Sequence, residues 1–313
     1  MFGTSARFLS DLKSSGLKPR ELIDLSSLRT VTSTGSTLTA DVCNWFYDHG
    51  FPSDIHLISM SGGTDMACSL VTGSPTLPVY SGEIQCDSLG MAVDIVDNTS
   101  STVVSIKETG EPGELVCLQP FPSQPVMFWG ENGMKRYQSS YFERFGNRVW
   151  CQGDFVMVVP DTKGILMLGR SDGVLNPSGV RFGSAEIYAI VEKIPDIDDS
   201  ICVGQRRPQD NDEAVVLFVK MKPSSRLTRQ LREEIKKAIR EARSPRHVPK
   251  YIFEITEIPY TVNGKKIELA VKQIVSGQPL KPNGAVANPA SFASYQRFFD
   301  IEKADQADLA AKL

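Results

Sequence analysis

The chain has 313 residues, a formal net charge of -3, 23% charged and 41% hydrophobic residues. This length suits one large or two medium domains, because a single core stops growing at about 250–300 residues. Lys and Arg number 34 against 37 Asp and Glu, so we expect no nucleic-acid partner, and the composition excludes a disordered or fibrous chain.

Cysteine usage and hydropathy point to the inside of a cell. The six cysteines are scattered without a Cys-x-x-Cys pair and are joined by only three histidines, which predicts free thiols rather than a zinc site or disulfides. No apolar run approaches the ~20 residues that a spanning helix needs, and no signal-peptide pattern opens the chain. We therefore expect a cytoplasmic protein without a membrane span.

Strand and helix signals alternate over the first 65 residues. Apolar runs at 28–36 and 55–65 each end in small polar residues, which is typical of a strand followed by a loop. Between them, residues 38–50 carry apolar side chains at helical spacing and stop at a glycine. This order predicts an α/β layer whose ligands bind at the loops after the strands.

The pattern of apolar and turn-forming residues then changes twice along the chain. Short strand candidates separated by Gly, Pro, Asn and Asp fill residues from about 80 to 168, which predicts a small β subdomain or barrel. Helical spacing at 184–194 and 228–243, interleaved with strand candidates, predicts a compact α+β unit of about 100 residues. Residues 276–313 are rich in Pro, Gly, Ala and Asn, and we expect an extended tail there.

The first motif with chemical potential is SMSGGTD, which ends at Asp65. Its glycines let backbone N–H groups approach an oxyanion, Thr64 can donate to a phosphate, and Asp65 can hold a magnesium ion that bridges phosphates. An ordinary Gly-rich turn has the same composition. The motif alone therefore leaves both interpretations open.

Two further motifs offer groups for a ribose or a phosphate. CQGDF sets Asp154 at a strand end, where a carboxylate can accept both ribose hydroxyls, although a β-turn has the same sequence. GRSDGVLNPSGVRFG adds the planar donors Arg170 and Arg181. Asp172 next to Gly173 can absorb a large backbone rotation and is a hinge candidate; a plain linker with surface charge pairs is the alternative.

The last motif is Asn263-Gly264-Lys265, in a turn after a strand. An ammonium group on a flexible stem can neutralise charge that develops on a transferring phosphoryl group. Asn-Gly is also the commonest hairpin turn, in which a flanking lysine is simply solvated.

Taken together and in this order, the four motifs resemble those of the adenylate-forming acyl-CoA synthetases. The strings GVRFGSAEIYAIVE, ARSPRHVP and TVNGKKIELAVKQI are most similar to members that activate acetoacetate, and the likeness covers almost all of the chain. The resemblance implies an acid–thiol ligase. ATP and acetoacetate would form an acyl adenylate with the help of Mg²⁺, and coenzyme A would then displace AMP.

The resemblance implies an α/β plus α+β fold. Residues 1–171 would form the C-terminal portion of the large AMP-binding domain, including the β subdomain at about 80–168. Residues 172–275 would form a compact, mobile lid domain, followed by the tail over 276–313.

The resemblance also implies a nucleotide site in the first 171 residues. One loop would line adenine and ribose, a second would contact the phosphates and magnesium, and a strand end would bind the ribose hydroxyls. These residues are Gly35, Ser36 and Thr37 for the first loop, Gly62, Gly63, Thr64 and Asp65 for the second, and Asp154 and Arg170 for the strand end.

The remaining implied roles fall in the lid domain. Lys265 would be the adenylation lysine, near the α-phosphate and the carboxylate oxygen in the first half-reaction only, and Asp172 would be the hinge. Arg181 would contact the phosphate side, Gly179 would let the pantetheine arm of coenzyme A approach the backbone, and Arg240 would contact a coenzyme A phosphate.

The sequence departs from the family in two ways. Acetate-activating relatives have a tryptophan at the position of Gly62, so we interpret the glycine as space for the longer acetoacetate. The Ser/Thr/Gly-rich loop ending in Lys that cradles the β- and γ-phosphates does not occur in the sequence. We therefore expect a missing N-terminal half or a partner to complete the fold. A non-catalytic module that binds a nucleotide or coenzyme A, or another protein, is the alternative function.

The final residues Ala311, Lys312 and Leu313 are a permissive form of the S-K-L peroxisomal address. Peroxisomal import is therefore the alternative to the cytoplasmic location.

Overall fold

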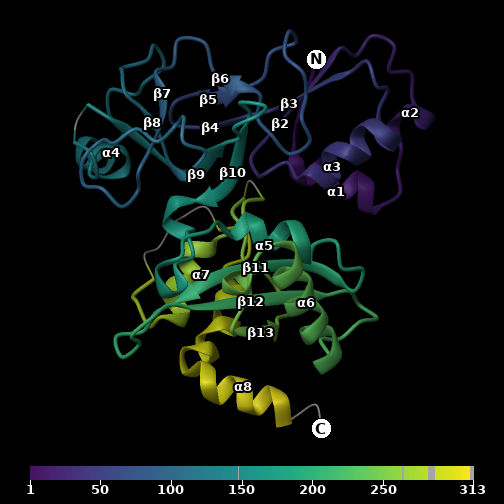
Figure 1. Cartoon of the computed structure of the whole chain (residues 1–313), viewed down its shortest axis with the longest axis vertical. Helices are drawn as coiled ribbons and strands as arrows, with labels where there is room; N and C mark the ends of the chain where they lie inside the picture. The colour runs from purple at the N-terminus through teal and green to yellow at the C-terminus, as the bar shows by residue number, and fades with distance from the viewer. Residues whose placement is uncertain (147, 263, 281–285, 311–313) are drawn as a thin grey trace. The chain divides into compact units, whose positions relative to one another are not determined.

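The computed structural model describes residues 1–146, 148–262, 264–280 and 286–310. Asn263 and the C-terminal tripeptide from Ala311 to Leu313 lie outside these ranges. The chain divides into two compact units, Met1–Ser171 and Asp172–Leu313 (Figure 1). Within the described ranges, no helix is both long and apolar enough to cross a membrane.

The first unit begins with a three-stranded parallel sheet in the order β1-β2-β3. Its strands are β1 (Phe2–Ser5), β2 (Thr30–Thr34) and β3 (His56–Ser59). Its helices are α1 (Ala6–Ser14), α2 (Pro19–Leu22) and α3 (Ala40–Trp45), the last continued by a π turn over Phe46–Gly50. The predicted strand–helix–strand order is confirmed, but α3 begins after Thr39, whose hydroxyl accepts from the N–H of Val42 at 3.4 Å.

The rest of this unit is antiparallel β structure. One three-stranded sheet contains β4 (Ser61–Gly63), β5 (Cys68–Thr72) and β6 (Cys86–Asp87). An open four-stranded sheet has the order β10-β9-β8-β7, formed by β7 (Val93–Val96), β8 (Gly113–Cys117), β9 (Trp150–Val158) and β10 (Ile165–Arg170). Helix α4 (Gly133–Tyr141) packs its tyrosines around the buried Trp150. Strands β6 to β10 lie within the range of about 80–168 predicted for a β subdomain, whereas β4 and β5 precede it.

The second unit has a three-stranded sheet with helices on both faces (Figure 1). Strands β11 (Ile197–Gln205) and β12 (Ala214–Met221) are antiparallel, and β13 (Tyr251–Glu254) runs parallel to β12. Helices α5 (Ser184–Val191) and α6 (Arg229–Ala242) cover one face. Helix α7 (Glu268–Val275) and the C-terminal segment cover the other. Because side chains alternate along a strand, Leu217 faces the first layer and Phe218 the second.

The C-terminal segment differs from the predicted extended tail. Residues Pro289–Asp300 form the 3₁₀ segment η5, and Ile301–Ala310 form helix α8. Tyr295 and Phe298 are fully buried against Phe218. The prediction of an extended tail relied on the Pro, Gly and Asn residues ahead of this segment and did not take into account the apolar residues that follow them. Burying these aromatic rings stabilises a packed segment where composition alone indicates a loose one.

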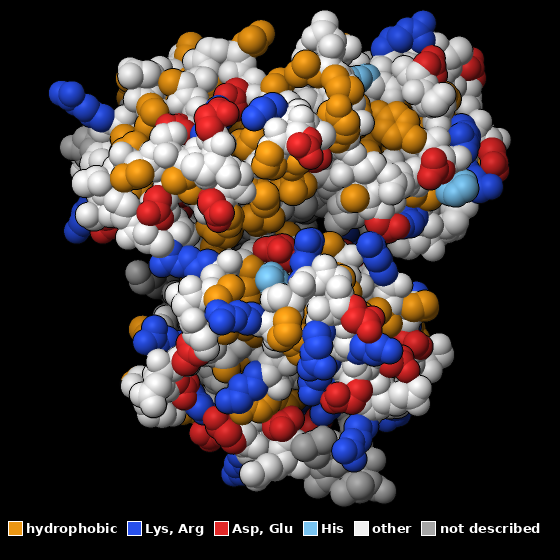
Figure 2. Space-filling model, in the orientation of Figure 1, with side chains coloured by type: hydrophobic (Ala, Val, Ile, Leu, Met, Phe, Trp, Pro, Cys, Tyr) orange, Lys and Arg blue, Asp and Glu red, His pale blue; other side chains and the backbone are white. Residues whose placement is uncertain are grey.

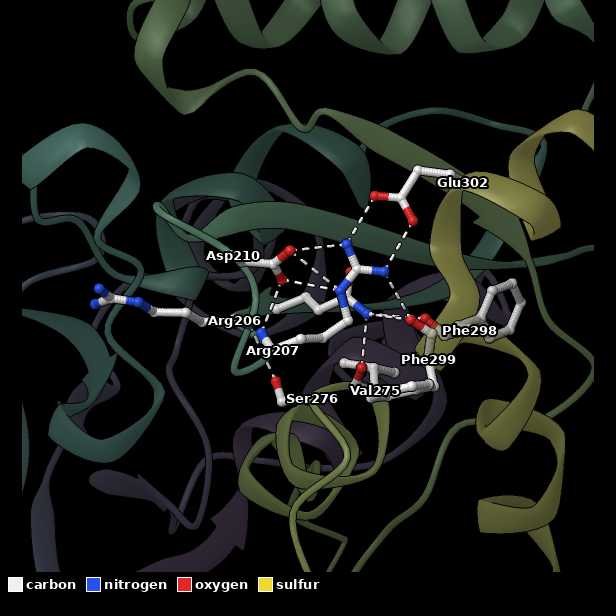
Figure 3. A network of polar contacts seen from close by, with 9 residues as sticks. Arg206, Arg207, Asp210, Val275, Ser276, Phe298, Phe299 and Glu302 are labelled. Carbon is white, nitrogen blue, oxygen red and sulfur yellow. Dashed lines mark hydrogen bonds and ion pairs between the residues drawn. The ribbon is translucent and has the colours of Figure 1, made fainter.

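Arg207 joins this segment to the sheet (Figure 3). Its guanidinium group donates to Glu302 at 2.7 and 2.8 Å, to Asp210 at 2.8 Å and to the carbonyl oxygen of Phe299 at 3.0 Å. Beside it, the amide of Gln205 donates to the carbonyl oxygens of Val275 and Phe298 at 2.6 and 2.9 Å. We call the contacts of Arg207 with Asp210, Glu302 and Phe299 the Arg207 clasp.

Candidate functional site

The first two candidate loops follow neighbouring parallel strands. Gly35, Ser36 and Thr37 come directly after β2, and the segment that begins at Ser61 follows β3 after one residue. Ser33 pairs with Ser59, and the N–H of Met60 donates to the carbonyl oxygen of Ser33 at 2.9 Å. The carboxyl ends of both strands therefore lie at one edge of the sheet, which is where α/β sheets bind ligands.

Asp154 lies in the middle of β9, not at the predicted strand end, and it pairs with Arg170, the last residue of β10. Asp154 is buried, and its carboxylate accepts from Arg170 Nη1 at 2.9 Å and from the hydroxyl of Ser61 at 2.9 Å. The amide of Gln152 donates to the carbonyl oxygen of Gly62 at 3.2 Å. The structure thus brings the candidate ribose pair to the candidate phosphate loop. The side chain of Arg170 is 54% exposed, so part of its guanidinium group can reach a ligand.

Gly153 allows this arrangement. Its φ is +77°, and a Cβ there would lie 2.5 Å from Arg170 Nη2. A glycine is therefore needed both for the backbone conformation and for the close passage of the guanidinium group.

Glu114 binds the backbone of the same part of β9 and was not predicted from the sequence. Its carboxylate is buried and accepts from the N–H of Gly153 at 2.8 Å and from Arg144 Nη1 at 3.1 Å. Burial raises the pKa of Glu114, while hydrogen bonds and the charge of Arg144 oppose the rise. Glu114 lies 39 residues before Gly153 in the chain, so no local motif could reveal the contact.

The candidate metal ligand Asp65 is exposed and follows β4 and Thr64 in a turn. The hydroxyl of Tyr141 donates to Asp65 Oδ2 at 2.5 Å, and the ring of Tyr141 stacks on Trp150 with centroids 3.7 Å apart. Burial and the Asp65 carboxylate raise the pKa of Tyr141. Helix α4, which carries this tyrosine, was not predicted.

A hollow of about 470 Å³ opens beside Asp65 and is lined also by Phe128, Trp129, Arg136, Ser139 and Ser140. Among the described residues, no three His, Cys, Asp or Glu side chains gather so that they could hold a metal ion. Mg²⁺ needs only one or two protein carboxylates when phosphate oxygens and water complete its shell. Asp65, with one oxygen bound to Tyr141 and the other available, fits that kind of site.

Gly62 requires a correction. A Cβ at this position would lie 2.0 Å from the carbonyl oxygen of Cys68 and 2.5 Å from the Cα atom of Ser69. The glycine is therefore needed where β4 and β5 approach each other closely. Our interpretation that Gly62 leaves space for a longer acid is not supported, because no side chain fits there without separating the two strands.

The remaining candidates lie on separate elements of the second unit. Lys265 is exposed in the turn before α7, and Arg240 is exposed near the end of α6. Gly179, with a φ of +81°, ends the 3₁₀ turn Pro177–Gly179, and Arg181 follows it by two residues. Figure 2 shows acidic side chains interleaved with the basic ones on the visible face of this unit.

The hinge candidate Asp172 is the first residue of the second unit. It lies in the 3₁₀ turn Ser171–Gly173, and a Cβ at Gly173 would lie 2.6 Å from Glu268 Oε2. Gly173 is therefore needed for close packing as well as being a candidate for backbone rotation.

Comparisons with known proteins define the class first. The family described as AMP-binding enzyme C-terminal domain matches residues 186–265, which form most of the second unit without its C-terminal cover. The second unit therefore contains a region that is similar to the C-terminal domain of AMP-binding enzymes, which is the class that the resemblance implied.

Within that class, the chain is a homologue of the acetoacetyl-CoA synthetases. It is 45% identical to that of Xenopus tropicalis over 302 residues, covering 96% of this chain and 44% of the relative. It is 46% identical to that of Rhizobium meliloti over 289 residues, covering 92% and 43%. The solved acetoacetyl-CoA synthetase from Streptomyces lividans matches with a TM-score of 0.83 at 35% identity, over 95% of this chain and 44% of that one. The chain thus spans less than half the length of these relatives.

Proposed function

We propose that this chain supplies the C-terminal part of an acetoacetate–CoA ligase. In the first half-reaction, the carboxylate of acetoacetate attacks the α-phosphorus of ATP to give acetoacetyl adenylate and diphosphate. In the second, the thiol of coenzyme A attacks the acyl carbon and releases AMP. The observation that carries this proposal is the 45% identity to an acetoacetyl-CoA synthetase over 96% of the chain.

The nucleotide would bind at the loops that follow β2 and β4. The Asp154 carboxylate would accept the ribose hydroxyls, which would compete with Ser61 for one of its oxygens. Arg170 would reach the same ribose with the exposed part of its guanidinium group, while Gly62, Gly63 and Thr64 would face the phosphates. The carboxylate of Asp65 would hold Mg²⁺ together with the phosphate oxygens. The ion would supply positive charge to neutralise the departing diphosphate.

The second unit would act as the lid. Lys265 would place its ammonium group against the α-phosphate during adenylation, and rotation about Asp172 would replace it with the segment around Gly179 for thioester formation. Arg181 would contact the phosphate side, and Arg240 would meet a phosphate of coenzyme A. Lys265 is well suited to this role because it is exposed, and among the described residues no ion pair engages its ammonium group.

The test is the formation of AMP and acetoacetyl-CoA by the purified chain from ATP, Mg²⁺, acetoacetate and coenzyme A. Replacing Lys265 by alanine should lower adenylate formation by about 100- to 1000-fold, the usual cost of removing one group that stabilises developing charge. Thioester formation from supplied acetoacetyl adenylate should be unchanged. Lys222→Ala, at another exposed lysine of the same unit, is the matched control. Equal loss in both half-reactions would contradict the role of Lys265.

A second candidate is a module that binds a nucleotide or coenzyme A without turnover. The chain spans less than half the length of the relatives that it matches, so binding without turnover is a distinct outcome for this chain. Calorimetric titration of the same preparation with AMP and coenzyme A distinguishes the two. Binding without product formation would favour the module, and Lys265-dependent turnover would exclude it.

A further inference from the structure

The two lysines of the Gly-Lys-Lys sequence point in opposite directions. Lys265 is exposed, whereas the side chain of Lys266 is only 18% exposed. Lys266 pairs with Tyr260 across an isolated antiparallel bridge, and successive side chains of extended backbone alternate in direction. The sequence alone does not indicate which of the two ammonium groups is free.

Lys266 pairs with two carboxylates, of which Asp199 is buried and Glu192 is exposed. Its Nζ is 2.9 Å from Asp199 Oδ1 on β11 and 3.0 Å from Glu192 Oε1, directly after α5. It also lies 4.0 Å from the centre of the Tyr188 ring, close enough for a cation–π contact. Burial alone would lower the pKa of Lys266, but the two carboxylates outweigh it and raise that pKa. Lys266 therefore stays charged and tied to both elements.

Two hydrogen bonds join Thr261 to Lys265 across the turn. The N–H of Thr261 donates to the carbonyl oxygen of Lys265 at 2.8 Å, and the N–H of Lys265 donates to the hydroxyl of Thr261 at 3.1 Å. Gly264 has a φ of +75°, which the turn needs. At its base, the hydroxyl of Tyr260 donates to Asp199, the carboxylate that also binds Lys266. Tyr260 and Lys266, which stand before and after the turn, thus both bind the buried carboxylate of Asp199.

We propose that Lys266 is a positioning residue for Lys265: its ion pairs with the buried Asp199 and with Glu192 hold this end of the turn so that the neighbouring ammonium group is kept in one place. This inference rests on the proposed function, in which Lys265 acts during adenylation. Precise placement matters because a displacement of about 1 Å can cost about 100-fold in rate. The role belongs to the first half-reaction only, since Lys265 is used only there.

The functional test separates the two half-reactions in Lys266→Met, Lys266→Arg and Tyr260→Phe. Lys266→Met should lower the kcat of adenylation by about 10- to 100-fold while the KM for acetoacetate changes by less than about twofold. Thioester formation from supplied adenylate should be unchanged. Lys266→Arg keeps the charge and should recover most of the adenylation rate, and Tyr260→Phe should give an intermediate loss. Equal loss in both half-reactions, or no recovery with arginine, would overturn the proposal.

A measurement of hydrogen exchange tests this inference independently of the proposed function. Hydrogen exchange of the Thr261 and Lys265 amides should be at least about tenfold faster in Lys266→Met than in the wild type, and unchanged in the control Lys265→Met. Unchanged exchange in Lys266→Met would overturn the positioning role even if the enzyme is active. If the wild-type chain forms no adenylate, the exchange result still decides the inference. Should Lys266→Met not fold, because it leaves the buried carboxylate of Asp199 without its cation, Tyr260→Phe carries the same exchange test.

Discussion

At the scale of single residues, a few contacts between distant parts of the chain determine how the candidate nucleotide site is built. Asp154 and Arg170 could be selected from the sequence because a Gly-Asp pair and a Gly-Arg pair form recognisable local strings, although Asp154 lies within β9 and not at a strand end as predicted. Tyr141 and Glu114 could not, since their partners lie 76 and 39 residues away and neither sits in a string that indicates chemistry. The opposite directions of Lys265 and Lys266 likewise depend on Asp199, which no local pattern connects to them.

Asp154 provides the sharpest test at this scale. In Asp154→Asn, one carboxylate oxygen becomes an amide group that cannot accept from Arg170 or from a ribose hydroxyl. We expect AMP affinity to fall by about tenfold or more. Leaving a buried hydrogen-bonding group without its partner costs about 1–3 kcal/mol. Isothermal titration with AMP measures this. The control is Asp161→Asn, at an exposed position between β9 and β10. An equal loss of AMP affinity in this control would contradict the role of Asp154 in ribose binding.

At the scale of elements, amphipathic periodicity accounts for what the sequence could predict. Helix α6 has buried Leu231, Ile235 and Ile239 at spacings of four residues, and its predicted extent is confirmed to within a residue or so at each end. Helix α4 was missed because it is polar nearly throughout, with Tyr137 as its one large buried side chain. The short strand β1 was missed because its edge-strand residues show no buried alternation.

The start of α6 offers a measurable prediction. The hydroxyl of Thr228 accepts from the N–H of Leu231 at 3.1 Å and satisfies a donor that the helix itself leaves free. Thr228→Ala should lower the free energy of unfolding of the second unit by about 1 kcal/mol, whereas Thr228→Ser should retain most of it. All three tryptophans lie in the first unit, so urea unfolding must be followed by far-ultraviolet circular dichroism. Equal stability of the alanine and serine variants would contradict the capping role.

At the scale of the whole molecule, composition predicted the wrong state for the C-terminal residues. Pro, Gly and Asn favour loops, but three apolar side chains at a spacing of three residues, Tyr295, Phe298 and Ile301, enter the core of the second unit. Tertiary burial outweighs local preference here. The boundary between the units falls after Ser171, where the strand texture of the sequence gives way to helical periodicity.

The Arg207 clasp makes the stability of the second unit depend on acid pH. Hydrogen bonds from Arg207 hold the pKa values of Asp210 and Glu302 below their ordinary values of 3.8 and 4.5. A carboxyl group with a lowered native pKa stabilises the fold fully above its unfolded pKa, and this contribution is lost as the pH falls through the native value. Denaturant unfolding at pH 6 and pH 3 should therefore show a smaller acid loss in Arg207→Met than in wild type. Arg206→Met, at the exposed neighbour, should behave like wild type; an acid loss in Arg207→Met as large as in wild type would exclude this role.

The Arg207 clasp also determines how much of the chain must be transferred if the second unit is exchanged between related proteins. The matched family region ends at residue 265, whereas Arg207, inside it, finds its partners at Phe299 and Glu302. A graft cut at the family boundary would carry a nearly buried guanidinium group without those partners and a sheet face without its aromatic cover. The structural unit is therefore longer than the region that the family match outlines, and a chimera should carry the second unit together with its own C-terminal segment.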